Sequence, residues 1–360
     1  MKIIRADLKN FMIFEHLDVE FSPGINVISG ENSTGKTALI KLLYSVLKGF
    51  TDAHTAKGDL TKEKLETALV TKLQGVFRPD HDAVGRLVNR RQGTNRADIR
   101  LNMDGGKEVT IEFGTRQERH IDFKENFLSD IKDTSPVYIP PKEIISATEN
   151  FGSLYSDYHI AFEETYYDLT RLLERPLRKG ANTNEQKRVM QSFEQIVNGK
   201  IIQKDKKFYL RMSGSGEFEM GLVSEGYRKL ATIMYLILSG SLSPNAILFW
   251  DEPETNMNPK MVRPLVDAII ELAKMGVQVF VTTHDYFVQQ CFNMAAMYPA
   301  APKKGEDIPK YNFLSLYKEN DCIRYEQKAY LSDLTHNAIM DEFDSLYDRE
   351  QELILHGNVK

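Results

Sequence analysis

The chain has 360 residues, of which 42% are hydrophobic and 27% charged, as expected for a globular protein with an ample core. Its formal net charge of −5 disfavours nonspecific nucleic-acid binding over a large face. The two cysteines form no Cys-x-x-Cys pair, and no apolar run approaches the roughly 20 residues of a membrane span. We therefore expect a cytoplasmic protein with reduced thiols and no membrane partner.

Residues 1–50 predict three strands, a loop and a helix, and the loop is the most informative feature of the chain. Residues 30–37 read Gly-Glu-Asn-Ser-Thr-Gly-Lys-Thr and match the phosphate-binding pattern G-x-x-x-x-G-K-[ST] at every fixed position. A short apolar strand precedes the loop, and apolar residues at helical spacing follow it. The alternative is a chance glycine-rich turn, which would not need a strand before it and a helix after it.

Loops of this kind hold phosphates with backbone N–H groups and the positive end of the following helix. Lys36 would reach the β- and γ-phosphates, and the Thr37 hydroxyl would ligate Mg²⁺. We assign nucleotide binding to a run of six residues: Asn32, Ser33, Thr34, Gly35, Lys36 and Thr37.

The segment from 51 to 219 mixes helix and strand patterns. Leucines four apart predict a helix over 60–77, and alternation split by Asp104-Gly105-Gly106 predicts a hairpin over 97–123. A short strand at 136–139, a helical insertion over 154–197 and a second hairpin over 199–212 follow. The insertion is predicted to break at 180–184, and its first helix carries apolar residues on one face: Phe162, Tyr166, Leu169 and Leu173.

Two groups of basic residues lie in the same segment. Either group could meet DNA phosphates or an acidic partner, although such runs are more often solvated faces. The first group is Arg86, Arg90, Arg91, Arg96 and Arg100, and the second is Arg171, Arg175, Arg178 and Lys179.

A second motif lies at 246–252, where Ala-Ile-Leu-Phe-Trp-Asp-Glu reads as a buried parallel strand ending in two carboxylates. Ligands bind at this end of the strands in open α/β sheets. Asp251 could hold Mg²⁺, and Glu252 could orient and deprotonate the attacking water. A solvated turn is the alternative for an isolated acidic pair. Together with the upstream loop, the pair predicts an ATPase.

The remainder of the chain alternates helix and strand from 226 to 297. A hairpin over 311–328 turns at Glu319-Asn320-Asp321, and a final helix covers about 337–355. Four apolar residues lie near one stripe of that helix: Ile339, Phe343, Leu346 and Leu353. We expect the helix to pack on its own domain, and docking to a partner is the alternative.

The motifs occur in the order found in one family. The chain resembles the ABC-type ATPase heads of SMC-like, RecF-like and OLD-like proteins, and within that group the compact bacterial AAA-type ATPases of the OLD/Septu-like kind. The resemblance covers roughly residues 1–50 and 220–295. It rests on Lys9-Asn10-Phe11, the run 22–30, the signature-like segment 222–229 in S-x-G form, the block 251–259 and Val281-Thr282-Thr283-His284.

The resemblance implies a dimer in which two heads enclose two ATP molecules. Ser224 and Gly226 of one subunit would then contact the γ-phosphate held by the other, and His284 would hydrogen-bond the γ-phosphate. Outside the family context, His284 reads as a strand-end residue that caps a turn. Glu143 lies where the family has its Q-loop, but the glutamine is missing; it is either a third Mg²⁺ ligand or a solvated loop carboxylate.

We therefore expect an α/β fold of the ABC-ATPase head type, a P-loop sheet with N-terminal antiparallel strands and a mainly helical insertion. The expected division is 1–50 and 220–330 for the two core halves, 51–219 for the intervening strands and insertion or lid, and 331–360 for the C-terminal helix. Many relatives serve phage defence or toxin–antitoxin modules, which implies an ATP switch, as a dimer or higher even oligomer, controlling a separate effector. A RecF-like DNA-repair ATPase that binds DNA is the alternative.

Overall fold

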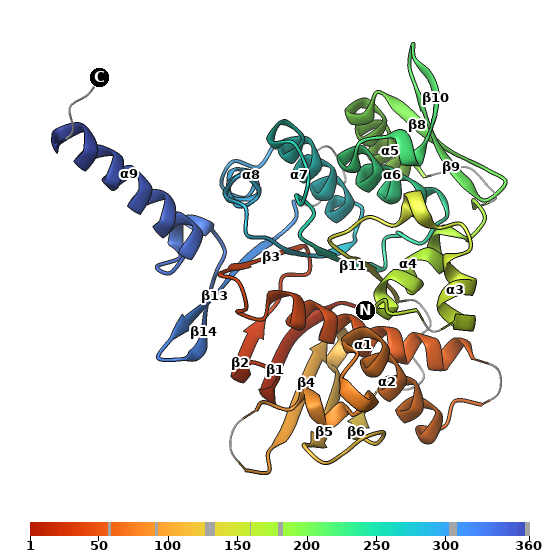
Figure 1. Cartoon of the computed structure of the whole chain (residues 1–360), viewed down its shortest axis with the longest axis vertical. Helices are drawn as coiled ribbons and strands as arrows, with labels where there is room; N and C mark the ends of the chain where they lie inside the picture. The colour runs from red at the N-terminus through yellow and green to blue at the C-terminus, as the bar shows by residue number, and fades with distance from the viewer. Residues whose placement is uncertain are drawn as a thin grey trace.

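A computed structural model describes residues 1–56, 59–90, 93–126, 134–158, 160–178, 183–301 and 308–356. Figure 1 shows two layers of helices separated by a sheet, a smaller antiparallel sheet at one end, and a C-terminal helix that extends away from the rest. This arrangement confirms the predicted α/β class with antiparallel N-terminal strands.

The central sheet has six strands in the order β14-β13-β3-β12-β11-β7. All neighbours are parallel except the β13–β14 hairpin. Every residue of β3, β11 and β12 is buried, as expected for parallel strands covered on both faces. The strands are β3 (Ile25–Gly30), β7 (Ser135–Ile139), β11 (Ala246–Asp251), β12 (Gln278–Thr282), β13 (Tyr311–Glu319) and β14 (Cys322–Lys328).

A second, antiparallel sheet has the order β2-β1-β4-β5-β6. The predicted hairpin over 97–123 forms β4 and β5, and its turn uses Gly105 and Gly106 at φ +72° and +73°. Because β4 pairs with β1, strands from the intervening segment complete the N-terminal sheet rather than a separate unit. The strands are β1 (Ile3–Phe11), β2 (Phe14–Glu20), β4 (Arg96–Met103), β5 (Lys107–Gly114) and β6 (Asp122–Glu125).

The central sheet separates two hydrophobic cores. Ile28 and Phe249 face the core that contains helices α1 (Lys36–Thr55) and α2 (Lys62–Phe77) and the antiparallel sheet. Val27 and Leu248 face the other core. That core is covered by α4 (Glu164–Leu173), α5 (Asn184–Val197), α6 (Glu225–Leu238), α7 (Pro259–Lys274) and α8 (Tyr286–Met297).

The predicted insertion forms α3 (Phe151–Tyr158), α4 and α5, and the predicted hairpin at 199–212 forms β8 and β9. These two strands and β10 make a three-stranded sheet: β8 (Gly199–Lys204), β9 (Lys207–Met212) and β10 (Gly216–Glu219). Leu169 and Leu173 are buried as predicted, whereas Phe162 precedes α4 and is 45% exposed. Part of the predicted break, 180–182, lies outside the described residues.

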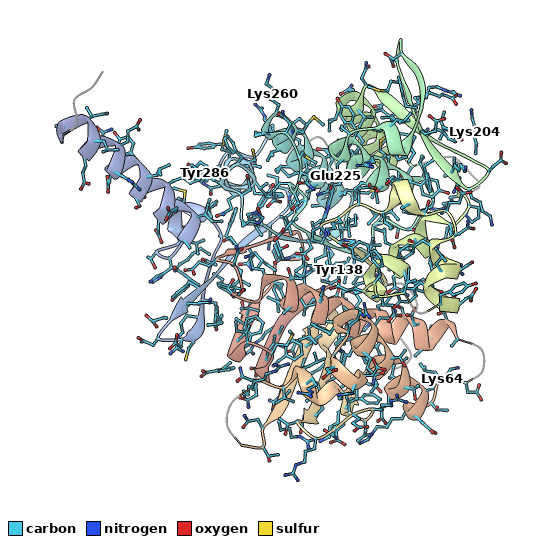
Figure 2. The ribbon with its side chains drawn as sticks, viewed as in Figure 1. Lys64, Tyr138, Lys204, Glu225, Lys260 and Tyr286 are labelled. Atoms are coloured by element: carbon cyan, nitrogen blue, oxygen red, sulfur yellow. The ribbon has the colours of Figure 1, made fainter. Side chains whose placement is uncertain are left out.

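The last helix, α9 (Ala338–His356), follows the predicted hairpin. Phe343 packs on Tyr286 with ring centroids 4.6 Å apart, and Figure 2 places Tyr286 on α8 near the start of α9. Beyond that contact Leu346, Tyr347 and Leu353 are 61–62% exposed. The prediction that this helix packs on its own domain is therefore correct only for its first residues, up to the contact of Phe343. No helix in the described ranges is both long and apolar enough to span a bilayer.

Candidate active site

The phosphate-binding loop connects β3 to α1 between the two sheets. Gly30 and Gly35 adopt φ of +142° and +96°. A Cβ at Gly30 would lie 2.0 Å from the Leu316 carbonyl oxygen, and one at Gly35 would lie 2.4 Å from the Phe14 ring. Both positions therefore require glycine, for conformation and for space. Thr34 closes the loop by donating to the Glu31 carbonyl at 2.9 Å.

Lys36 folds its amine back into the loop. Its Nζ donates to the carbonyl oxygens of Gly30 and Glu31, each at 2.8 Å. Burial lowers the pKa of Lys36, while the negative charges of Glu252 and Asp251 oppose that shift. The amine is thus the local positive charge between the loop and the carboxylates, where a phosphate would sit.

The first turn of α1 leaves its N–H groups free for a ligand. Gly35, at its N-cap, offers no side-chain cap, and no acidic residue occupies the first turn. Uncapped N–H groups and the helix dipole suit an anion. Asn32 and Ser33 are exposed at the loop, while Thr34 is buried. The loop residues therefore fit a nucleotide phosphate chain.

Asp251 ends β11 beside Thr37. One carboxylate oxygen, Oδ1, accepts from the Thr37 hydroxyl at 3.0 Å and from the Thr282 hydroxyl at 2.5 Å. The other, Oδ2, accepts from the Tyr138 hydroxyl at 3.0 Å. Burial raises the pKa of Asp251, and the hydrogen bonds from the three hydroxyls counteract this.

Asp251 and Thr37 offer oxygen atoms, which Mg²⁺ prefers. No group of three or more His, Cys, Asp or Glu side chains within the described ranges could hold a metal. This donor set fits Mg²⁺, which usually binds one or two protein oxygens together with substrate phosphates, and it does not fit a metal that needs a full protein cage.

Glu252 follows Asp251 with a left-handed backbone, φ 46°. Its N–H donates to Thr282, to the carbonyl at 3.2 Å and to the hydroxyl at 3.1 Å. Glu252 Oε1 lies 3.4 Å from His284 Nδ1, and Oε2 accepts from Thr255. The two side chains predicted to be catalytic therefore meet at the end of the sheet, on a strained turn of the kind that concentrates at functional sites.

Two further polar side chains support this turn and were not predicted. Glu254 is buried, and its Oε1 accepts from the Thr283 hydroxyl at 2.6 Å and from the His284 N–H at 3.4 Å. Lys229 is buried on α6 and donates to the carbonyls of Pro253 and Thr255. Both residues lie in motifs that the sequence analysis singled out, Glu254 in the block 251–259 and Lys229 at the end of the signature-like segment, but neither motif indicated these contacts.

The signature-like segment lies at the start of α6. Ser224 is the N-cap residue, is exposed, and makes no side-chain capping bond. Gly226 is buried, and a Cβ there would lie 3.4 Å from Met257. Glu225 accepts from Asn256 at 3.1 Å, which ties this helix start to the segment after Glu252.

Glu143 does not join Thr37 and Asp251. Its carboxylate pairs with Arg228 at 3.0 Å and accepts from Ser146. The turn after β7 directs the side chain toward α6, so its contacts lie with the signature helix rather than with the expected Mg²⁺ ligands. The solvated-loop alternative also fails, because only 9% of its side chain is exposed.

Comparison with known proteins agrees with this geometry. A family profile described as “AAA domain, putative AbiEii toxin, Type IV TA system” matches residues 25–288. The chain belongs to this family. It is an ATPase with an ABC-type head of the SMC/RecF group, as the order of motifs predicted.

Solved structures show the same fold. An SMC head bound to the C-winged helix domain of ScpA covers 92% of this chain and 99% of its own, with a TM-score of 0.55 and 13% identity. An SMC head with an extended coiled coil, bound to the C-terminal domain of ScpA derived from Pyrococcus furiosus, covers 96% and 99%, with a TM-score of 0.53 and 12% identity. At these identities the likeness shows the fold of the head.

Sequence relatives match over shorter stretches. A structural maintenance of chromosomes protein 6 from Dictyostelium discoideum is 32% identical over 115 residues, 29% of this chain and 10% of the relative. A DNA replication and repair protein RecF from Agathobacter rectalis is 32% identical over 111 residues, 31% of this chain and 27% of the relative. The chain thus corresponds to a minor part of these relatives' length.

Proposed function

We propose that this ATPase is a switch subunit: two chains close on two ATP molecules, hydrolysis releases them, and the cycle controls a separate effector, a nuclease or toxin, in a bacterial defence or toxin–antitoxin system. One observation carries the dimer. Within one chain Thr37 contacts Asp251, and the neighbouring Glu252 contacts His284. The Ser224 hydroxyl, in contrast, is exposed and makes no hydrogen bond among the described residues.

The loop residues bind the substrate ATP through backbone N–H groups, and Lys36 neutralises phosphate charge. Thr37 and Asp251 hold Mg²⁺, which, when bound, neutralises charge on the transferring phosphoryl group. Glu143 contacts neither Thr37 nor Asp251, so we do not count it among the Mg²⁺ ligands. We assign it instead to anchoring α6 through Arg228.

Glu252 acts as the base that orients and deprotonates water. Its contact with His284 gives the carboxylate a fixed direction, and His284 remains 51% exposed and able to turn toward a phosphate. Ser224 and the N–H groups near Gly226 supply donors at a helix start for the γ-phosphate in the other chain.

Ser224→Arg tests the composite site. Among the described residues, Ser224 makes no hydrogen bond to the loop that holds Lys36. ATP binding by a single chain should therefore remain, while the larger, charged side chain blocks closure of the dimer. We expect hydrolysis to fall about 100-fold, the order seen when an oxyanion donor is lost. Ser215→Arg, on an exposed turn before β10, is the matched control and should retain turnover. Loss of ATP binding by Ser224→Arg would instead place Ser224 in its own chain's site.

The exposed half of α9 supports a separate partner. The 19 residues of the whole helix include six carboxylates and one arginine. The net charge of α9 is therefore −5, which equals the net charge of the whole chain. The rest of the chain is therefore neutral overall. Two α9 helices from two copies would repel each other, whereas a groove that is apolar and flanked by Lys and Arg would complement both the charge and the exposed leucines. We assign α9 to such a groove on the effector.

Leu346→Glu tests this assignment. A photo-reactive side chain at Leu353 first identifies the protein that contacts α9, and its affinity is then measured with purified proteins. Leu346→Glu should weaken binding at least about 30-fold, as at a buried hot spot, and added salt should weaken binding by the wild-type chain. Ser345→Glu adds the same charge on an exposed neighbouring position and is the control. Cross-linking only to a second copy of the chain would refute the effector assignment.

The RecF similarity favours DNA repair as the second candidate. A DNA-repair role predicts that DNA stimulates ATP hydrolysis and that this stimulation falls steeply as the salt concentration rises. The arginine clusters speak against it, because Arg96 binds Glu112 and Asp122 and Arg100 binds Asp98. In the second cluster Arg171 binds Glu174. Arg91 and Lys179 lie outside the described residues.

A further inference from the structure

Tyr138 makes a contact that the assigned roles do not use. It lies on β7, the parallel neighbour of β11, where Tyr138 is paired with Phe249. Its side chain is 1% exposed and reaches toward the carboxyl end of β11, where the hydroxyl donates to Asp251 Oδ2 at 3.0 Å. Figure 2 shows Tyr138 near the centre of the molecule, beside α1.

The three hydrogen bonds to Asp251 are divided unequally between its two carboxylate oxygens. Thr37 and Thr282 both donate to Oδ1, and Tyr138 donates to Oδ2. If the Thr37 oxygen turns to Mg²⁺, Thr282 and Tyr138 are the two side chains left to fix the carboxylate. One holds each oxygen, so together they restrict rotation of the carboxylate plane.

Tyr138 is itself held firmly. Its ring lies 5.3 Å from that of Tyr44 on α1, and the Tyr44 hydroxyl donates to Asp168 on α4 at 2.7 Å. A tyrosine hydroxyl is neutral below about pH 10, so this group is a hydrogen-bond donor at any working pH. A buried, neutral donor of fixed position suits the orientation of a metal-binding carboxylate.

We propose that Tyr138 is a positioning residue for Mg²⁺: its hydroxyl holds Asp251 Oδ2 so that Oδ1 faces the Thr37 hydroxyl, where the cation binds. This rests on the proposed roles of Asp251 and Thr37. Strand β7 therefore contributes to the Mg²⁺ site through Tyr138, while Glu143, in the turn after this strand, pairs with Arg228 of α6.

Tyr138→Phe removes the hydroxyl and keeps the ring. Trp250, the only tryptophan, adjoins Asp251 and is buried, so its fluorescence can follow binding of a non-hydrolysable ATP analogue. We expect the Mg²⁺ concentration for half-maximal binding to rise about 10-fold to 100-fold, the usual cost of losing a partner of a metal ligand. Binding of the analogue in EDTA should not change. A general loss of stability would weaken binding of the analogue both with Mg²⁺ and in EDTA, so weakening that appears only in the Mg²⁺ dependence isolates the role of the hydroxyl.

Tyr44→Phe is the matched control, because it removes a buried hydroxyl from the same aromatic pair without touching Asp251. Its Mg²⁺ dependence should match wild type. Asp251→Asn separates the two proposals. If it leaves the Mg²⁺ dependence unchanged, the proposed metal role of Asp251 is wrong. If it raises the Mg²⁺ requirement and Tyr138→Phe does not, the positioning role of Tyr138 is wrong. The double variant should show no further shift beyond Asp251→Asn.

Discussion

Replacing Glu252 with glutamine is expected to reduce ATP turnover about 10²-fold to 10⁴-fold while leaving ATP binding intact. Glutamine keeps the size of the side chain and its contact with Thr255 but cannot accept a proton from water. The loop contacts of Lys36 do not involve Glu252, so ATP should still bind. Phosphate release and retention of labelled ATP measure the two effects separately.

Glu149→Gln is the control for this substitution. Glu149 carries an exposed carboxylate that pairs with Lys207, away from the loop, so turnover should stay near wild type. Near-normal turnover by Glu252→Gln would contradict the base assignment. Loss of ATP binding would instead show that Glu252 contributes charge to the binding of the nucleotide.

Replacing Lys72 with methionine is expected to lower the free energy of unfolding by about 3–5 kcal/mol, because it removes the buried cation that three carboxylates share. Asp52 and Asp168 also contact the partly exposed Lys48, whereas Glu164 loses its ion pair. The amine lies 2.5 Å from Glu164, 2.9 Å from Asp168 and 3.2 Å from Asp52, and 4% of its side chain is exposed. Burial alone would lower the pKa of Lys72, but these carboxylates outweigh burial and raise it. Urea denaturation measures the loss.

The sign of the pH dependence follows from Glu164. Burial raises the pKa of Glu164 while Lys72 opposes the shift, so the variant should raise it further. A carboxyl whose pKa is higher in the folded state loses stabilisation as pH rises through that pKa. The deficit of Lys72→Met should therefore shrink as pH falls toward about 4, the ordinary range of carboxyl groups.

Lys64→Met provides the reference on the same helix. Lys64 is only partly exposed on α2, where its Nζ donates to the Ala56 carbonyl at 3.3 Å, and its removal should lower stability by about 1 kcal/mol at most. Equal losses for the two lysines would show that helix propensity, rather than the buried cluster, accounts for the effect. The cluster joins α2 and α4, so its loss should also loosen the insertion from α1.

The sequence predicted the fold class, most helices and strands, and the residues of the loop and of Asp251–Glu252, because these depend on local spacing. It did not predict that β4 would pair with β1 or that β7 would lie beside β11. Those pairings join segments far apart in the chain, and alternation of apolar residues does not specify a neighbour. The contact of Tyr138 with Asp251 depends on them.

The direction of side chains in loops also could not be predicted from the sequence. Glu143 follows a correctly predicted strand, but the turn decides whether it faces the loop or α6, and it faces Arg228. The helix α9 was also predicted with its apolar stripe, yet the stripe alone does not say what covers it. In the structure, Phe343 contacts the body and Leu346 does not.

The central claim is that ATP joins two of these chains through Ser224 of one and the phosphate site of the other. The most direct measurement is the molar mass of purified Glu252→Gln by light scattering, with and without Mg²⁺ and ATP. The account predicts the mass of one chain without nucleotide and twice that mass with it, and no doubling when Ser224→Arg is added. A mass that stays at one chain while ATP is bound would contradict the account.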